Sequence, residues 1–116
     1  MSPSEPVRCG DIWLVDFGDP LGHEHERQRP AVVVSSNRLN DSPAGLAIVV
    51  PCTRRRTGLP SHVLVPPAKS GLEEFWFAKV EDVKSVASER LVRRFGSVDR
   101  AVLNTLRDVL ATLFEL

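Results

Sequence analysis

The chain has 116 residues, which is enough for one compact domain and too few for two. Hydrophobic residues make up 42% of it and charged residues 26%, and no apolar run approaches the roughly 20 residues of a membrane-spanning helix, so we expect a soluble, cytoplasmic protein. The formal net charge is zero, which excludes a uniformly basic nucleic-acid binder but not one with segregated charges.

The N-terminal part of the sequence predicts an arm, a strand and a loop. Residues 1–7 lack the basic start and apolar stretch of a secretory signal, so we expect a short flexible arm before a single domain at 8–116, and no export. A strand is predicted at 12–17, where an apolar run is closed by a Gly-Asp-Pro turn. Residues 21–28 have no periodicity and predict an exposed loop.

Two prolines mark the next strands. A β-branched run at 29–36 begins with an Arg-Pro pair, and the proline biases Arg29 towards an extended conformation at the first positions of a strand. A loop is predicted at 37–45, rich in Asn, Asp, Ser, Pro and Gly. The apolar run at 46–53 predicts a strand whose Pro51 indicates an edge or a bulge.

The second half of the chain ends in a helix. A basic connection follows the third strand, and further strands are predicted at 61–65, 75–80 and 91–95. From Asp99 onward apolar residues recur at three- and four-residue spacing, which predicts an amphipathic helix capped by Ser97 or Asp99. Short strands followed by one helix predict a mainly β fold, a small curled sheet or barrel covered by the C-terminal helix.

The charges are unevenly distributed along the chain. Six acids and one arginine occupy residues 5–26, whereas six arginines and one acid occupy residues 27–56. A second basic group follows at Arg90, Arg93 and Arg94. The planar guanidinium suits bidentate phosphate contacts, although a solvated charged surface explains any single cluster equally well.

The two cysteines give little support for thiol or metal chemistry. Cys52 lies in an apolar run and is interpreted as a buried core residue, since a thiolate nucleophile needs a partner histidine that the sequence does not place. No CxxC or HExxH spacing is present, so we expect no metal site and no cofactor.

Five segments, at residues 8–17, 22–35, 49–53, 59–63 and 90–96, carry short motifs in order. They resemble the motifs of MazF/PemK toxins: the opening R-G-[DE]-[IV]-[WY] strand, here with a cysteine inserted after the arginine, G-x-E-x-x-x-x-R-P, V-x-P-[IC]-T, L-P-[ST]-H-V and a late R-L…G strand. Each motif is short, and their order and separation carry the resemblance.

The resemblance implies an SH3-like β-barrel with a C-terminal helix packed on it. It further implies the toxin of a type II toxin–antitoxin system, a homodimer with single-stranded RNA along its interface and a cognate antitoxin. The activity that the resemblance implies is that of an mRNA interferase, an enzyme that cuts RNA at short sequence motifs without metal. Its catalytic arginine and threonine correspond to Arg29 and Thr53. Taken alone, these two would be interpreted as a surface arginine and a strand-end threonine.

Metal-free RNA cleavage uses the ribose 2′-OH as the nucleophile and leaves 2′,3′-cyclic phosphate and 5′-OH ends. We expect Arg29 to stabilise the charge that develops on the phosphate, because a guanidinium is a poor proton donor. Thr53 is expected to orient the scissile group. The predicted RNA-binding residues are Glu24, His25, Arg54, Arg55, Arg56, His62, Trp76 and Glu81.

Several of these roles stay open at this point. Glu24 is either a base, an RNA contact or an exposed carboxylate, and His25 shares its loop. His62 is either a hydrogen-bond partner of a base or phosphate or a structural histidine on a strand. Trp76 is either a platform for a splayed base or part of the core. Many family members carry serine and then E-Q-I where this chain has Trp76 and then Glu-Asp-Val, so the RNA motif of relatives does not transfer.

Two rival functions fit the same fold. One is a non-enzymatic toxin similar to the CcdB gyrase poisons, which binds a protein target. The other is a catalytically silent RNA-binding module. The Arg29 and Thr53 pair favours the nuclease, because a pure binder has no need for it.

Overall fold

A computed structural model describes residues 5–18, 27–67 and 69–116. The strands in these ranges are β1 Asp11–Asp16, β2 Gln28–Val33, β3 Leu46–Thr53, β4 His62–Val65, β5 Trp76–Lys79, β6 Lys84–Ala87 and β7 Leu91–Ser97. The helices are α1 Asn37–Asn40 and α2 Arg100–Phe114, with short 3₁₀ turns η1 Val80–Asp82 and η2 Ser88–Arg90. No helix within the described ranges is long and apolar enough to span a membrane.

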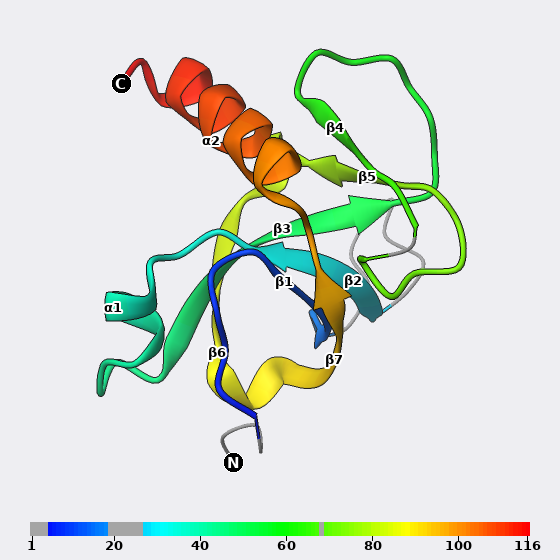
Figure 1. Cartoon of the computed structure of the whole chain (residues 1–116). Helices are drawn as coiled ribbons and strands as arrows, with labels where there is room; N and C mark the ends of the chain where they lie inside the picture. Colours follow the sequence, from blue (N-terminus) through cyan, green and yellow to red (C-terminus); the bar gives the residue numbers. More distant parts are fainter. Residues whose placement is uncertain (1–4, 19–26, 68) are drawn as a thin grey trace.

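The strands form one antiparallel sheet in the order β4-β5-β3-β2-β1-β7, and β6 pairs with β3 outside this path. Figure 1 shows the sheet curling beneath α2, which lies across one side of it. The mainly β class with a C-terminal helix is therefore confirmed. The predicted barrel is not closed, because the hydrogen-bonded path of the described strands ends at β4 and at β7.

Strand β3 is the centre of the sheet. One of its edges pairs with β2, and its other edge pairs first with β6, over Leu46–Val49, and then with β5, at Cys52 and Thr53. Pro51 lies where β6 gives way to β5. Of the two alternatives predicted for Pro51, an edge or a bulge, the edge is wrong because β3 has neighbours on both sides. A residue without an N–H is accommodated where the neighbouring strand changes.

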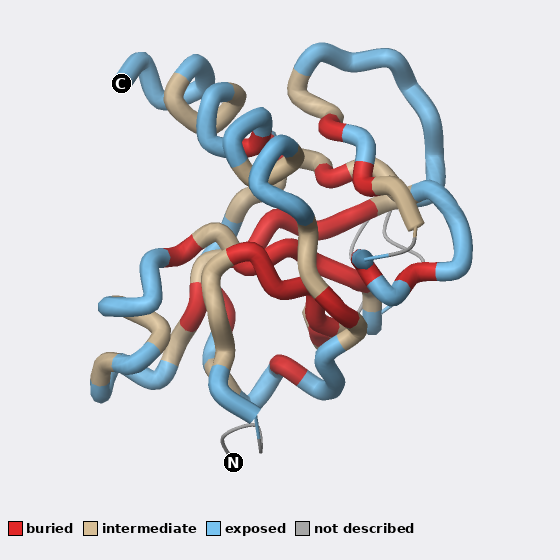
Figure 2. The backbone as a smooth tube through the Cα atoms, in the orientation of Figure 1, coloured by how far each residue is buried: buried red, intermediate tan, exposed pale blue. Residues whose placement is uncertain are grey.

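Alternating side chains of the central strands build two cores, seen as the buried segments at the centre of Figure 2. The helix-side core consists of Ile12, Val32, Val50, Cys52, Val63, Val65, Leu72, Ala78, Val80 and Leu106. The second core, on the opposite face of the strands, consists of Trp13, Val15, Ala31, Val33, Ala47, Val49, Val86 and Leu91.

Helix α2 closes the helix-side core. Leu106 is fully buried, and Val102, Val109 and Leu110 pack beside it, as the helical periodicity predicts. Of the two predicted caps, the structure uses Asp99, whose carboxylate accepts the backbone N–H of Val102 at 3.0 Å.

Two elements differ from the sequence-based prediction. The predicted loop 37–45 contains α1, a single turn capped by Ser36 and stabilised by side-chain hydrogen bonds rather than by apolar burial. The serine-rich segment before β7 contains β6, of which only Val86 is buried. Neither has the apolar periodicity on which the prediction depends.

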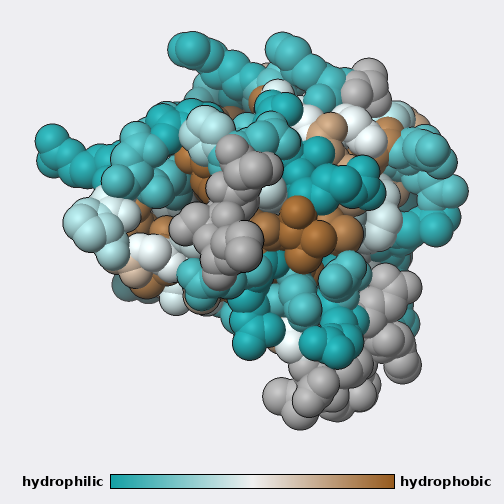
Figure 3. All heavy atoms as spheres, turned by 90° about the horizontal axis from the view of Figure 1, so that it is seen from below, coloured by the Kyte–Doolittle hydropathy of each residue, from teal (hydrophilic) through white to brown (hydrophobic). Residues whose placement is uncertain are grey.

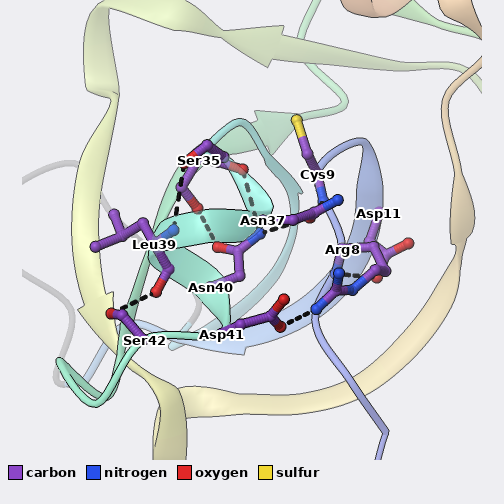
Figure 4. Close-up of polar contacts among 10 residues, drawn as sticks. Arg8, Cys9, Asp11, Ser35, Asn37, Leu39, Asn40, Asp41 and Ser42 are labelled. Carbon is purple, nitrogen blue, oxygen red and sulfur yellow. Dashed lines mark hydrogen bonds and ion pairs between the residues drawn. The ribbon is translucent and has the colours of Figure 1, made fainter.

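The segment before β1 is fastened to α1 by polar contacts (Figure 4). The Arg8 guanidinium pairs with Asp41, and the backbone N–H of Cys9 donates to the side-chain oxygen of Asn37 at 2.7 Å. The buried carboxylate of Asp11 accepts the Arg8 backbone N–H at 2.9 Å and the Trp13 indole N–H at 3.2 Å. The opening motif of the chain therefore has a structural role, because its residues hold the segment before β1 against α1.

Candidate active site

Arg29 and Thr53 emerge on the same face of neighbouring strands. Ala31 of β2 pairs with Pro51 of β3, and Arg29 and Thr53 each lie two residues beyond this pair, towards the same end of the ladder. Residues two apart on a strand share a face, so both side chains start on the face of the second core. Figure 1 shows the start of β2 beside the end of β3.

Arg29 lies in a surface cavity of about 280 Å³ lined by Phe17, Arg29, Pro51, Asp82, Val83 and Lys84. Its guanidinium carbon is 5.2 Å from the centroid of the Phe17 ring, and the ammonium of Lys84 is 5.5 Å from the same centroid. Phe17 itself packs on the second core. The aromatic ring therefore gives both cations a fixed support.

Thr53 lies in a neighbouring cavity of about 150 Å³ lined by Thr53, Arg55, Thr57, Leu59, His62, Lys79 and Glu81. The Thr53 hydroxyl oxygen accepts the backbone N–H of Arg55 at 3.1 Å. A threonine hydroxyl can accept this bond and still donate its own hydrogen. Thr53 is thus oriented by the chain that follows it while its donor stays available.

The side chain of His62 is largely buried, with only 4% of it exposed. One ring nitrogen, Nε2, lies 3.0 Å from the Glu81 carboxylate, and the other, Nδ1, lies 3.0 Å from the Thr57 hydroxyl. The second oxygen of Glu81 accepts the Ser61 hydroxyl at 2.8 Å. These four side chains, the Thr57–His62–Glu81–Ser61 network, connect the segment after β3 to η1.

The network alters the ionisation of Glu81. Partial desolvation raises the pKa of this carboxyl, but hydrogen bonds from Ser61, from its own backbone N–H and from His62, together with attraction to the His62 ring, outweigh that effect. The net result is a pKa below the ordinary value for glutamate. Glu81 is therefore ionised near neutral pH, where its carboxylate holds the side chains of Ser61 and His62 in place.

The three arginines after β3 have different surroundings, although all are exposed. Arg54 pairs with Glu74, and its guanidinium carbon is 6.0 Å from the Trp76 ring centroid. Arg55 and Arg56 form no ion pair with a described acid. Figure 2 shows this segment as part of a long exposed arc between β3 and β4.

Trp76 is partly buried and packs against the helix-side core. Its neighbour Phe77 pairs with Thr53, so Phe77 and not Trp76 shares the face of Thr53. In the second basic group, Arg90 and Arg94 form ion pairs with Asp16 and Asp11.

Two predicted site residues, Glu24 and His25, lie outside the described residues.

Cys52 is fully buried in the helix-side core, and burial raises the pKa of its thiol to about 12, against the opposing influence of Arg29 and of a hydrogen bond with the Val32 backbone. Such a thiol stays protonated near neutral pH, in agreement with its interpretation as a core residue. The described ranges contain no group of three or more His, Cys, Asp or Glu side chains placed to hold a metal ion.

The sequence-based site did not include Phe17 or Lys84, which the structure brings to Arg29. Phe17 is near Arg29 because β1 and β2 pair. Lys84 is near Arg29 because it lies on β6, a strand that the sequence-based prediction missed, and β6 pairs with β3. Pairing of Lys84 with Val49 of β3 directs it to the face of the second core. Only this long-range pairing places a lysine beside Phe17, and the local sequence carries no signal for it.

Residues 8–114 match the family model of PemK-like, MazF-like toxins of type II toxin–antitoxin systems. Endoribonuclease MazF9 of Mycobacterium tuberculosis is 37% identical over 115 residues, which cover 95% of this chain and 98% of that protein. Endoribonuclease toxin MazF of Escherichia coli is 38% identical over 78 residues, or 67% of this chain and 66% of that protein.

Solved structures share the fold over almost the whole chain. MazF (form I) from Deinococcus radiodurans superimposes with a TM-score of 0.80 at 25% identity, covering 97% of this chain and 100% of that one. A mycobacterial endoribonuclease in complex with its cognate antitoxin gives a TM-score of 0.77 at 23% identity, with 97% of both chains covered.

Proposed function

Since the chain belongs to the PemK-like, MazF-like toxin family of type II toxin–antitoxin systems, we propose that it is a cytoplasmic toxin that cleaves single-stranded RNA at short sequence motifs without a metal ion. The observation that carries the chemical part of this proposal is the emergence of Arg29 and Thr53 on one face of adjacent strands. A phosphodiester lying across the start of β2 and the end of β3 can contact both side chains.

The reaction needs no covalent enzyme intermediate. The ribose 2′-oxygen attacks the adjacent phosphorus and loses its proton to a base, while the bond from phosphorus to the 5′-oxygen breaks and that oxygen takes up a proton. The products are a 2′,3′-cyclic phosphate and a 5′-OH end. Glu24 and His25, which precede β2 in the sequence, are the proposed groups for proton transfer.

Arg29 stabilises the negative charge that gathers on the phosphoryl oxygens. A guanidinium stays protonated far above neutral pH, so its value lies in fixed charge and in several donors. The contact with Phe17 restricts its orientation before RNA binds. Removing one preorganised donor of this kind typically slows catalysis by about 10²–10³-fold.

Thr53 donates its hydroxyl hydrogen to a non-bridging phosphate oxygen. The hydroxyl oxygen accepts the Arg55 backbone N–H, and the hydroxyl hydrogen stays available as a donor. Thr53 thereby holds the scissile group in line for attack rather than attacking it.

The remaining basic side chains near the site follow the RNA backbone. Arg55 and Arg56 are exposed and suit phosphate contacts, which position RNA without reading its sequence. A base that reaches Trp76 has to stack beside the Arg54 guanidinium already over that ring. Glu81 and His62 support RNA binding by holding the segment that carries these arginines.

The proposed partners are a second copy of the chain and a cognate antitoxin. The D. radiodurans and mycobacterial relatives include structures of the toxin with its antitoxin, which supports an equivalent complex here.

The deciding experiment incubates purified protein with unstructured RNA in excess EDTA and determines the chemistry of the new ends. We expect cleavage at a short recurrent motif with 5′-OH and 2′,3′-cyclic phosphate ends, because the 2′-OH is the nucleophile and the cations are side chains. Activity that appears only after a divalent metal is added, or ends carrying a 5′-phosphate, would contradict the proposal. Intact RNA together with toxicity in cells would favour the rival toxin that binds a protein target.

A further inference from the structure

Two cations converge on one aromatic ring at the candidate active site. The ammonium of Lys84 and the guanidinium of Arg29 lie 5.5 and 5.2 Å from the centroid of the Phe17 ring. Lys84 is held in this place by β6, where it pairs with Val49 on the face that also carries Arg29. Both side chains line the same cavity of about 280 Å³.

An ammonium group that lines a cavity without a carboxylate partner attracts an anion into it. Among the described lining residues Asp82 carries the carboxylate, but its oxygen is 3.0 Å from the ammonium of Lys79. Lys84 forms no ion pair with a described acid, whereas Arg54 and Lys79 nearby do. The positive charge of Lys84 is therefore directed into the cavity without a protein counter-ion from the described residues.

We propose that Lys84 binds a backbone phosphate of the RNA next to the scissile phosphate. Arg29 then holds the scissile phosphate and Lys84 the adjacent one, with both cations in contact with the Phe17 ring. This rests on the proposed function, since it takes RNA as the ligand of the Arg29 cavity. An ammonium is a point charge without the planar fork that recognises base edges, so Lys84 contributes affinity and register but no sequence preference.

The test measures binding and cleavage separately. The RNA for binding spans a cut site mapped with the wild-type protein and carries a 2′-O-methyl group at the cut position, which removes the nucleophile. Its dissociation constant is measured over a range of salt concentrations for the wild type, Lys84→Gln and Lys84→Arg. Lys69→Gln serves as the matched control, because Lys69 is exposed and lies in a different part of the surface.

We expect Lys84→Gln to weaken binding about tenfold at low salt and to reduce the slope of log K against log salt by about 0.7, the value for one phosphate contact on a single strand. Lys84→Arg should restore the slope, and Lys69→Gln should leave it unchanged. A wild-type slope and affinity in Lys84→Gln would overturn the proposal. So would an equal loss in Lys84→Gln and Lys84→Arg, which indicates a structural role.

A failure of the proposed function gives a different result from a failure of the Lys84 proposal. If the wild-type protein cuts no RNA, the nuclease assignment fails; an unmodified single strand then replaces the blocked RNA, and its salt slope still decides whether Lys84 contacts a phosphate.

Discussion

At the scale of single residues, the side chains nearest the proposed chemistry are supported by neighbouring protein groups. Phe17 supports Arg29, the backbone of Arg55 orients Thr53, and His62 and Glu81 fix the segment that carries the exposed arginines. For His62 the sequence left an RNA contact and a structural role open, and in the structure its ring is almost fully buried with partners for both nitrogens. We therefore propose positioning roles for His62 and Glu81.

The lowered pKa of Glu81 predicts a pH-dependent contribution to stability. A carboxyl whose pKa is lower in the folded than in the unfolded state stabilises the fold above the unfolded value, about 4.3, and this stabilisation is lost as the pH falls through the lower folded-state value. Because Glu81 is partly exposed, we expect Glu81→Gln to cost at most about 1 kcal/mol at pH 7, or a few degrees in Tm, and less near pH 3.

Thermal unfolding of the wild type and Glu81→Gln at the two pH values checks this prediction. Glu89→Gln is the matched control, since Glu89 is exposed and has no hydrogen-bond or ion-pair partner among the described residues. A Tm difference for Glu81→Gln that is the same at both pH values would show that the carboxylate charge has no role.

At the scale of secondary structure, the sequence specified those elements whose apolar pattern is strong. The central strands and α2 were predicted close to their observed positions because alternating or helical burial shapes their composition. α1 and β6 were missed because hydrogen bonds and strand pairing stabilise them. The site shows the same division, with Arg29 and Thr53 predicted from motifs and Phe17 and Lys84 found only after the chain is folded.

The close approach of residues 69–72 to β7 yields a prediction about glycine. Gly71 has a φ of +75°, and a Cβ atom there would lie 2.0 Å from the carbonyl oxygen of Phe95. Gly45 has a similar φ of +68° but open space around it. Gly45→Ala should cost about 1–2 kcal/mol from the left-handed backbone alone, and Gly71→Ala should cost about 2 kcal/mol more because the backbone must move.

Urea unfolding of the two variants, with an unchanged m-value as the criterion for a shared two-state transition, provides the measurement. Equal losses of stability in Gly71→Ala and Gly45→Ala would contradict the packing of this segment against β7.

At the scale of the whole molecule, the curled sheet and its helix leave several large apolar side chains exposed. Figure 3 shows a mostly hydrophilic surface around a compact apolar group. Among the described residues, the large apolar ones with 45% or more of their surface exposed are Leu59, Leu64, Phe75, Val92, Leu113, Phe114 and Leu116. The proposed homodimer and antitoxin complex give such side chains a use that the single chain does not.

The central proposal is that two strands bring Arg29 and Thr53 to one phosphodiester, and a double-mutant cycle on single-turnover RNA cleavage tests it most directly. Arg29→Ala should slow cleavage by about 10²–10³-fold while changing the affinity for blocked RNA far less. Combining it with Thr53→Val should slow the reaction little beyond the slower single variant, because groups that act on the same phosphate lose their effect together. Rate losses that simply multiply, or an Arg29→Ala variant that loses binding as much as cleavage, would show that the two residues do not act on a shared phosphate.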